Sequence, residues 1–157
     1  MNTAIVYYSQ HHGNTEKLLK AIASKHEVTL INVTEQHEAD LSTYDRIGFA
    51  SGIYYSSFAK QVLNLARENL PTNKQVFFLA TCGAPRKNYF DAIRQVTRDK
   101  QCAELGAYLC LGFDTFGPFK LIGGLAKGHP TEDEIAGAVT FYEGLNNKGE
   151  AISNARK

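Results

Sequence analysis

The sequence lacks the features that would place it in several specialised classes of protein. Its longest apolar runs, such as residues 76–80, fall far short of the roughly 18 residues needed to cross a bilayer. Its cysteines, Cys82, Cys102 and Cys110, are odd in number and form no CxxC pair. This spacing argues against a disulfide framework and a zinc site, and reduced thiols are expected.

Strong charge and the common nucleotide motifs are also missing. The 17 Lys and Arg residues against 16 Asp and Glu residues leave a net charge of +1, which argues against nucleic-acid and membrane partners. Neither G-x-G-x-x-G nor G-x-x-x-x-G-K-[ST] occurs. Cys82 and Arg86 are spaced C-x3-R rather than the C-x5-R of phosphotyrosine phosphatases, and the five histidines form no spaced metal motif. The first residues show no basic stretch or cleavage site typical of a secretory signal, so we expect a cytoplasmic protein.

What is present predicts one α/β domain. The chain has 157 residues, of which 43% are hydrophobic, enough for a single core. Nearly continuous apolar runs, typical of strands covered on both faces, predict a parallel sheet. The expected strands are residues 3–8, 28–33, 45–51, 75–81 and 107–113.

Amphipathic segments lie between these strands and predict the helices. They cover about residues 15–25, 58–69, 88–100 and 132–145, with a short helix near 38–42. The alternation predicts a three-layer sandwich with a five-stranded parallel sheet in the order 2-1-3-4-5. We expect residues 1–145 to form the domain and residues 146–157 to be a poorly ordered polar tail. Ligands of such folds bind beyond the carboxyl ends of the strands, where the order reverses.

The loop after the first strand has the chemistry of a phosphate site. It reads Ser-Gln-His-His-Gly-Asn-Thr over residues 9–15 and runs straight into the first helix. Unpaired N–H groups and the positive end of the helix dipole attract an anion there, and Ser9, Asn14 and Thr15 add short side chains. The same side chains are also ordinary helix caps, so this loop alone leaves both interpretations open.

This loop resembles the phosphate loop of flavodoxins, Ser/Thr-x-Thr-Gly-x-Thr, in its Gly-Asn-Thr ending at residues 13–15. It is one residue longer, and His11 and His12 stand where hydroxyl residues are usual, either adding charge or filling the turn. The resemblance extends over about residues 3–145. It implies that FMN binds with its phosphate in this loop.

Two further loops resemble the parts of flavodoxins that hold the flavin ring. Ser-Gly-Ile-Tyr-Tyr-Ser over residues 51–56 resembles the loop whose aromatic side chain stacks on the ring, and Thr-Cys-Gly-Ala-Pro over 81–85 resembles the loop that contacts its polar edge. The stretch GFDTFGPFKLIGG at 112–124 is similar to a signature of a bacterial subgroup of the family. We expect Phe116 or Phe119 to help close the flavin pocket.

The resemblance implies a set of FMN-binding residues and neither catalytic nor metal-binding residues. Cys82 is expected to be structural rather than a nucleophile. The set is Ser9, Gln10, His11, His12, Gly13, Asn14 and Thr15; Gly52, Ile53, Tyr54 and Tyr55; and Thr81, Cys82, Gly83 and Tyr89.

Three functions follow from this set. The first is a cytoplasmic electron-transfer protein that passes electrons to a redox partner protein. The second is an FMN-dependent oxidoreductase that takes electrons from NAD(P)H and gives them to a quinone or similar acceptor. The third is a flavin-free binding module on the same fold. Similarity favours the first, whereas a locally basic rim of Lys60, Arg86, Lys87, Lys120 and Lys127 favours the second and predicts a less negative potential for the reduced flavin than in acidic flavodoxins.

Overall fold

A computed structural model describes residues 1–10, 12–115 and 117–155 and shows a parallel sheet at the centre of the chain. Its strands are β1 (Thr3–Tyr8), β2 (Thr29–Asn32), β3 (Arg46–Tyr54), β5 (Gln75–Cys82) and β6 (Ala103–Leu111). They lie in the order β2-β1-β3-β5-β6, and each neighbouring pair is parallel. Numbered without the short β4, this is the predicted order 2-1-3-4-5, so the predicted fold is confirmed.

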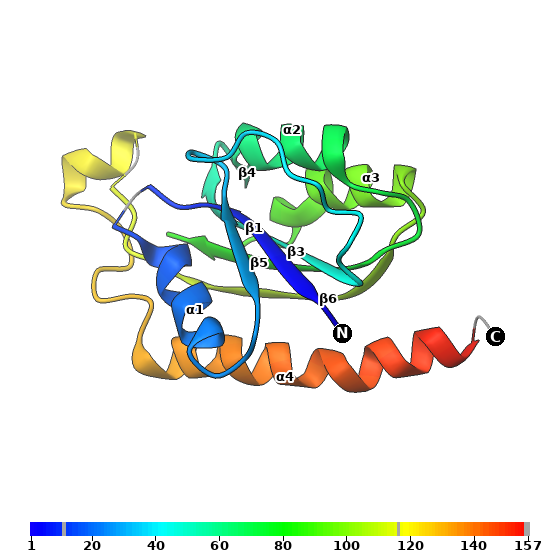
Figure 1. Ribbon diagram of the computed structural model, residues 1–157. Coiled ribbons are helices and arrows are strands. Elements are labelled where there is room, and N and C mark those ends of the chain that lie inside the picture. Colours follow the sequence, from blue (N-terminus) through cyan, green and yellow to red (C-terminus); the bar gives the residue numbers. More distant parts are fainter. Residues whose placement is uncertain (11, 116, 156–157) are drawn as a thin grey trace.

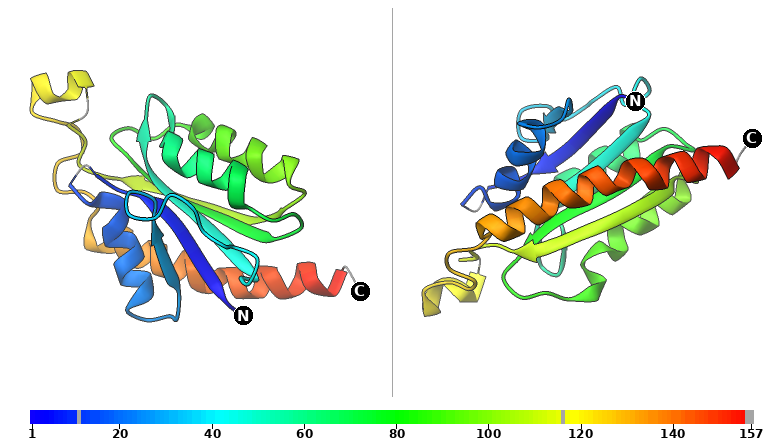
Figure 2. Two further views of the ribbon diagram at one scale, coloured as in Figure 1. Left: turned by 45° about the horizontal axis from the view of Figure 1, so that its top comes forward. Right: turned by 90° about the horizontal axis from the view of Figure 1, so that it is seen from below.

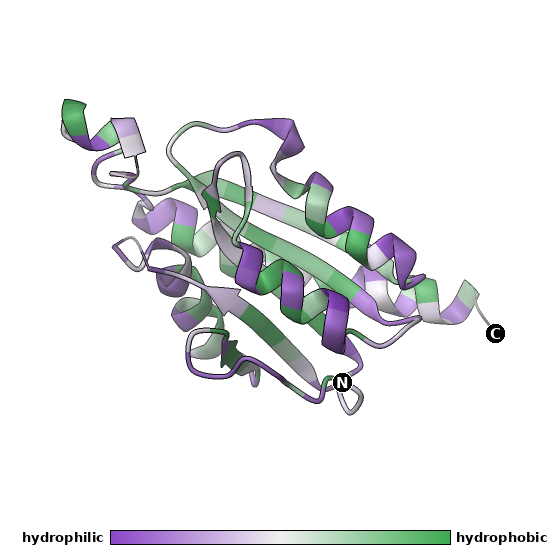
Figure 3. Cartoon of the chain, turned by 90° about the horizontal axis from the view of Figure 1, so that it is seen from above, coloured by the Kyte–Doolittle hydropathy of each residue, from purple (hydrophilic) through white to green (hydrophobic). Residues whose placement is uncertain are grey.

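Helices cover both faces of this sheet (Figure 1). One face carries α1 (Asn14–Ala23) and α4 (Glu132–Ala155), and the other carries α2 (Lys60–Asn69) and α3 (Asp91–Asp99). Each face has its own apolar core, and the strands contribute alternate side chains to the two. Hydropathy colouring shows green strands between helices that are banded green and purple (Figure 3). This is the three-layer arrangement that the continuous apolar runs predicted.

A short hairpin follows β3. Residues Ser57–Phe58 form β4, which pairs antiparallel with the end of β3. The two residues between them, Tyr55 and Ser56, have φ of 48° and 63°, as in the two-residue turns that match the twist of a hairpin. The sequence carried no Asn-Gly or Asp-Gly signal for this turn, and β4 was not predicted.

Two predictions are wrong: the short helix near residues 38–42 and the start of the last strand. The region 38–42 is not helical: the Ser42 N–H donates to the Asp40 carboxylate, and Ala39 and Leu41 are buried on either side of Asp40. The last strand begins at Ala103 rather than residue 107. Its first residues do not form an apolar run, because Glu104 accepts a hydrogen bond from Arg94 at the surface and the pairing with β5 is shifted near Phe77.

The expected disordered tail is helical instead. Helix α4 continues through residue 155 and runs along and beyond one face of the sheet (Figure 2). Its second half is held by buried polar groups from the sheet. Arg46 donates to Asn146 Oδ1 at 3.0 Å and Gln75 donates to the Gly149 carbonyl at 3.0 Å. These contacts compensate for the scarcity of apolar residues that suggested disorder.

Four loops meet at the carboxyl ends of the strands, at the left of Figure 1. They follow β1, β3, β5 and β6. The loop after β5 leads into a short 3-10 helix, η1 (Lys87–Phe90), and the long loop after β6 contains a second, η2 (Gly117–Ile122). This end of the sheet is where the strand order predicts a ligand site.

Candidate functional site

The loop between β1 and α1 places the start of the helix beside the ends of β5 and β6. His12 and Gly13 have φ of 57° and 64°, so the chain turns sharply before Asn14 begins the helix. The N–H of Glu16 donates to Ser9 Oγ at 3.3 Å. Helix geometry provides no intrahelical partners for the other N–H groups of this first turn. The loop therefore presents positive dipole ends to the space between the strand ends.

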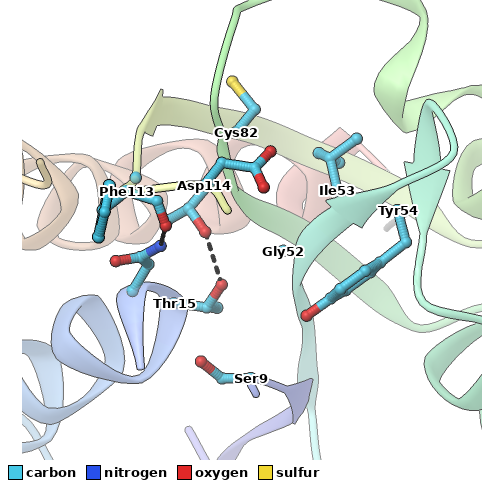
Figure 4. Close-up of a pocket in the computed structure, with 11 residues that line it drawn as sticks. Ser9, Thr15, Gly52, Ile53, Tyr54, Cys82, Phe113 and Asp114 are labelled. Carbon is cyan, nitrogen blue, oxygen red and sulfur yellow. Dashed lines mark hydrogen bonds between the residues drawn. The ribbon is translucent and has the colours of Figure 1, made fainter. Parts of the chain in front are cut away.

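A polar pocket lies in front of this helix end, and we call it the inner pocket (Figure 4). The hydroxyl of Tyr54 points toward Ser9 and Thr15, whereas the sulfur of Cys82 points away from them. The side chains that line it are mostly hydroxyl, amide and apolar groups, with Asp114 as the charged one. The lining is Ser9, Asn14, Thr15, Gly52, Ile53, Tyr54, Thr81, Cys82, Gly112, Phe113 and Asp114.

Hydrogen bonds fix the floor of the inner pocket. Thr15 Oγ1 lies 2.9 Å from Thr81 Oγ1, and Asn14 Nδ2 donates to the Phe113 carbonyl at 2.7 Å. Gly112 permits this close approach, since a Cβ there would lie 2.8 Å from Asn14 Nδ2. Asn14 Oδ1 is buried and has no hydrogen-bond partner among the described residues. A buried acceptor without a partner costs free energy, so this atom marks a place where a ligand hydroxyl would be stabilising.

A larger, more aromatic pocket adjoins the inner one, and we call it the outer pocket. It has a volume of about 310 Å³ and shares Ile53, Cys82 and Asp114 with the inner pocket, so the two form one continuous site. Its other walls come from the hairpin turn, the β5 loop and the loop after β6. The full lining is Ile53, Tyr55, Ser56, Cys82, Gly83, Ala84, Arg86, Tyr89, Asp114, Gly117, Pro118 and Phe119.

The paired tyrosines have different surroundings. Tyr54 packs back onto the domain, with its ring 5.6 Å from that of Tyr8 in an edge-to-face arrangement. Tyr55 stands at the turn with 88% of its surface exposed and lines the outer pocket. The structure therefore places the Tyr55 side chain at the wall of the outer pocket and the Tyr54 hydroxyl among the polar groups of the inner pocket.

Cys82 and Tyr89, on the β5 side of the site, keep their protons at physiological pH. Burial, together with the nearby carboxylates of Asp114 and Glu134, raises the pKa of the Cys82 thiol to about 11. Burial also raises the pKa of Tyr89, whose hydroxyl donates to the Ala84 carbonyl at 2.6 Å and so fixes the β5 loop. A protonated thiol is a poor nucleophile, in agreement with the structural role expected for Cys82.

The structure brings most of the predicted site residues together. Ser9, Asn14, Thr15, Gly52, Ile53, Tyr54, Thr81 and Cys82 line the inner pocket, and Tyr55, Gly83 and Tyr89 line the outer one with Phe119. Gln10, His12 and Gly13 belong to the same loop but do not line either pocket. His11 and Phe116, which were also predicted to contribute, lie outside the described residues.

His12 contacts the long loop after β6. Its ring lies 4.4 Å from that of Phe113, and its Nε2 lies 3.1 Å from Thr115 Oγ1. Of the two roles that the sequence left open, this placement fits filling the turn: His12 fastens the first loop to the loop after β6.

The residues from Gly112 to Asp114 were missing from the predicted set, although they contribute to both pockets. They lie at the end of the predicted fifth strand, residues 107–113, and directly follow the observed β6, at the edge of the sheet where the fold places ligands. That position is the signal that would have identified them. Asp114 matters most because it puts a carboxylate where the two pockets join.

The arrangement of strands, helices and pockets agrees with comparisons to known proteins. A model of the flavodoxin domain family matches residues 5–106. An uncharacterized protein of Methanocaldococcus jannaschii is 36% identical over 147 residues, covering 92% of this chain and 98% of its own. The chain belongs to the flavodoxin family.

Solved structures show the same fold. A WrbA-like flavodoxin from Agrobacterium tumefaciens superposes with a TM-score of 0.66 at 16% identity, covering 96% of this chain and 98% of that one. Two-electron reduced flavodoxin from Megasphaera elsdenii gives a TM-score of 0.58 at 20% identity, covering 87% and 97%. At such identities the likeness concerns the fold and not the detailed site.

The described part of the chain offers neither a metal site nor a membrane-spanning helix. Within residues 1–10, 12–115 and 117–155, no group of three His, Cys, Asp or Glu side chains is arranged to hold a metal ion. In the same ranges, none of the helices has the length and apolar character to span a membrane. The combined inner and outer pocket is therefore the site on which we base the function.

Proposed function

We propose that this chain binds FMN non-covalently in the combined pocket and carries electrons between redox partners in the cytoplasm. The observation that carries the proposal is the joining of two chemically different pockets. The inner one offers hydroxyl groups, an amide and the N-terminus of α1, which suit a phosphate. The outer one offers Tyr55 and Phe119, which suit a planar aromatic ring.

Each part of FMN would have its own contacts. Ser9, Thr15 and the first-turn N–H groups of α1 would hold the phosphate. Asn14 Oδ1 and the Asp114 carboxylate, both acceptors, would receive the hydroxyl groups of the ribityl chain. The β5 loop would face the polar edge of the ring, as the family resemblance implies.

The protein supplies binding, orientation and electrostatics, and the bound flavin supplies the electron chemistry. Tyr55 and Phe119 would exclude water from part of the ring while leaving an edge accessible to a partner. Since the Cys82 thiol is protonated, no covalent attachment through it is expected.

Titration of the flavin-free protein with FMN, followed by flavin fluorescence, tests this function. We expect Thr15→Val to weaken FMN binding by about 10–100-fold, because it removes a hydroxyl bonded to a charged group. Thr97→Val is the matched control. Thr97 is also buried, and its hydroxyl donates to the Arg94 carbonyl at 3.1 Å away from the site, so its loss should leave FMN affinity unchanged.

Two outcomes would contradict the proposal. A protein that takes up no FMN would have no flavin function. Riboflavin binding as tightly as FMN would show that the phosphate is not recognised at the start of α1.

One observation supports the oxidoreductase alternative. Arg86 lines the outer pocket and Lys87 follows it, so the mouth of the site offers cations to the phosphates of NADH or NADPH. Stopped-flow mixing of FMN-loaded protein with each nucleotide separates the two functions. The flavin of a carrier would be reduced very slowly without a partner enzyme. The flavin of a reductase would lose its visible absorbance within the time of one catalytic turnover, and the electrons would then pass to a quinone.

A further inference from the structure

An exposed apolar tip projects beside the mouth of the outer pocket. It is formed by residues 117–127, which we call the projecting segment, and it extends from the carboxyl end of the sheet (Figures 1 and 2). Helix η2 within it has no buried residue. Leu121 is 89% exposed and Ile122 is 69% exposed. Large exposed apolar side chains that lie together are typical of surfaces that contact another molecule.

The base of the segment is fastened, so the apolar tip is held outward by the fold. Asp114 and Leu125 exchange two backbone hydrogen bonds of 2.9 and 2.7 Å, and the Gly124 N–H donates to the Phe119 carbonyl at 2.7 Å. Gly124 has φ of 91°, and a Cβ there would clash with the ring of Phe113. Specific bonds and a required glycine therefore define the geometry of this segment.

Positive charge surrounds the same mouth. Lys120 and Lys127 lie on the projecting segment, and Arg86 and Lys87 lie on the facing β5 loop. Set against Asp114, these four cations leave a local charge of +3. Glu134, in the acidic first turn of α4, pairs with His129 and the Thr131 N–H. A cationic rim attracts an anionic partner and accelerates its approach.

We propose that the projecting segment and this rim are the docking surface for an acidic redox protein with an apolar patch among its carboxylates. This inference rests on the proposed function. Leu121 and Ile122 would pack into the apolar patch, and the cations would meet the surrounding carboxylates. Two of the four cations, Arg86 and Lys87, lie on the β5 loop across the pocket mouth. A redox partner must occupy this position to reach the flavin edge, so we favour a protein over a membrane.

Electron transfer to acceptors of opposite charge tests the proposal. FMN-loaded, reduced protein is mixed with oxidised rubredoxin, a small acidic iron protein, and with oxidised basic cytochrome c, and the reduction of each iron is followed by absorbance. The rate with rubredoxin should fall as salt is added, because screening weakens attraction between opposite charges. The rate with cytochrome c should rise.

Two double variants locate the surface, and a third is the control. At low salt we expect Lys120→Glu with Lys127→Glu to slow rubredoxin reduction by about tenfold or more, as steering contributes about 10–1,000-fold to association rates. Lys25→Glu with Arg98→Glu is the control, because it changes the net charge by the same amount at two exposed positions near the other end of the sheet. It should change the rate less than about twofold. Leu121→Ser with Ile122→Ser should slow the reaction by about threefold or more at high salt, where packing dominates. Reduction of neutral benzoquinone should be unaffected in all three.

Several results would overturn the docking surface. The first two are equal rates for the charge-reversed and control variants, and a preferential reaction with cytochrome c at low salt. The others are binding of the wild type to anionic phosphatidylserine vesicles in place of rubredoxin, and a dimer in solution that Leu121→Ser with Ile122→Ser dissociates. Failure of the proposed function is distinguishable, because the protein would then take up no FMN. Calorimetric titration of the colourless chain with rubredoxin would still test docking. Binding that is lost in Lys120→Glu with Lys127→Glu would support the docking surface, and no binding by the wild type would overturn it.

Discussion

Tyr55 pays a conformational cost to stand at the mouth of the outer pocket. Its φ of 48° lies in the left-handed region, which costs a non-glycine residue about 1–2 kcal/mol, and its side chain is 88% exposed. We therefore expect Tyr55→Gly to raise the free energy of unfolding of the flavin-free protein by about 0.5–1 kcal/mol. FMN affinity should fall at least about threefold, because ring stacking is lost. Urea unfolding and FMN titration measure the two effects.

A second residue with the same backbone conformation provides the control for Tyr55→Gly. Gln101 has φ of 56° and is exposed, but it lies in the turn before β6 at the opposite end of the sheet. Gln101→Gly should stabilise the protein similarly and leave FMN affinity unchanged. If Tyr55→Gly destabilised the protein or left affinity intact, the turn would not be strained for ligand binding.

At this scale, the sequence predicted which residue types form the site but not what each one touches. Ser9, Asn14 and Thr15 were recognisable because short polar residues before an amphipathic helix have a known chemistry. Their partners were not, since the Thr15 hydroxyl meets Thr81 and the Asn14 amide meets Phe113 only after distant strands pair. The contact between His12 and Thr115 has the same long-range origin.

The N-terminus of α4 is closed by a reciprocal pair of hydrogen bonds. The N–H of Thr131 donates to Glu134 at 2.6 Å, the N–H of Glu134 donates to Thr131 Oγ1 at 3.2 Å, and His129 Nδ1 lies 2.8 Å from the same carboxylate. Partial burial opposes ionisation, but these bonds outweigh it and lower the pKa of Glu134. The Thr131 and Glu134 pair is a capping box, a motif defined by its spacing in the sequence, whereas His129 reaches the same carboxylate only through the folded loop.

The lowered pKa sets the direction of a pH effect. A carboxyl group with a lower pKa in the folded state stabilises the protein above its unfolded-state pKa, and this contribution is lost as the pH falls through the folded-state value. We expect Glu134→Gln to lower the free energy of unfolding by about 1 kcal/mol at pH 7. The difference should shrink in acid, as measured by urea unfolding at several pH values. Glu132→Gln, exposed in the same helical turn, should show no such pH-dependent difference.

The second half of α4 depends on a buried arginine. Arg46 is 1% exposed, and in the described residues no carboxylate lies within ion-pair distance of it. Asn146 Oδ1 accepts from its guanidinium, so Asn146→Ala should lower the free energy of unfolding by about 1–2 kcal/mol. Asn147→Ala is the control, because Asn147 is exposed on the same helix, and it should be neutral or slightly stabilising. Equal effects in thermal or urea unfolding would show that Arg46 does not hold the helix.

Elements with strong periodicity were predicted well, and those stabilised by specific polar contacts were not. Strand β1 was predicted at its observed bounds, and α1 to within two residues, because apolar spacing alone defines them. The end of α4 was mistaken for a tail because Arg46 and Gln75, which hold it, are far away in the sequence. Strand β4 and helix η2 were not predicted, because turns with positive φ lie next to both and apolar spacing does not reveal such turns.

Charge acts at the scale of the whole molecule, and here it is nearly balanced. The net charge of +1 predicts little long-range effect on the flavin, so the nearest groups should determine its reduction potential. The sequence predicts that the cationic rim stabilises a reduced anionic flavin, and this stays a prediction. Asp114 opposes it from within the site, because it lines both pockets whereas Lys120 and Lys127 line neither.

Asp114→Asn therefore tests which charge dominates. Removing a carboxylate from the pocket wall should make the potential for forming the anionic reduced flavin less negative by about 40 mV, since a charge at this range contributes on the order of 1 kcal/mol. Asp133→Asn removes the same charge from an exposed position in the first turn of α4 and should shift the potential much less. Redox titration of the two FMN-loaded variants at low and high salt measures the shifts. Equal shifts in the two variants would show that the reduction potential follows the net charge of the molecule. A shift in Asp114→Asn alone that salt barely changes would show that the carboxylate at the junction of the two pockets sets the reduction potential.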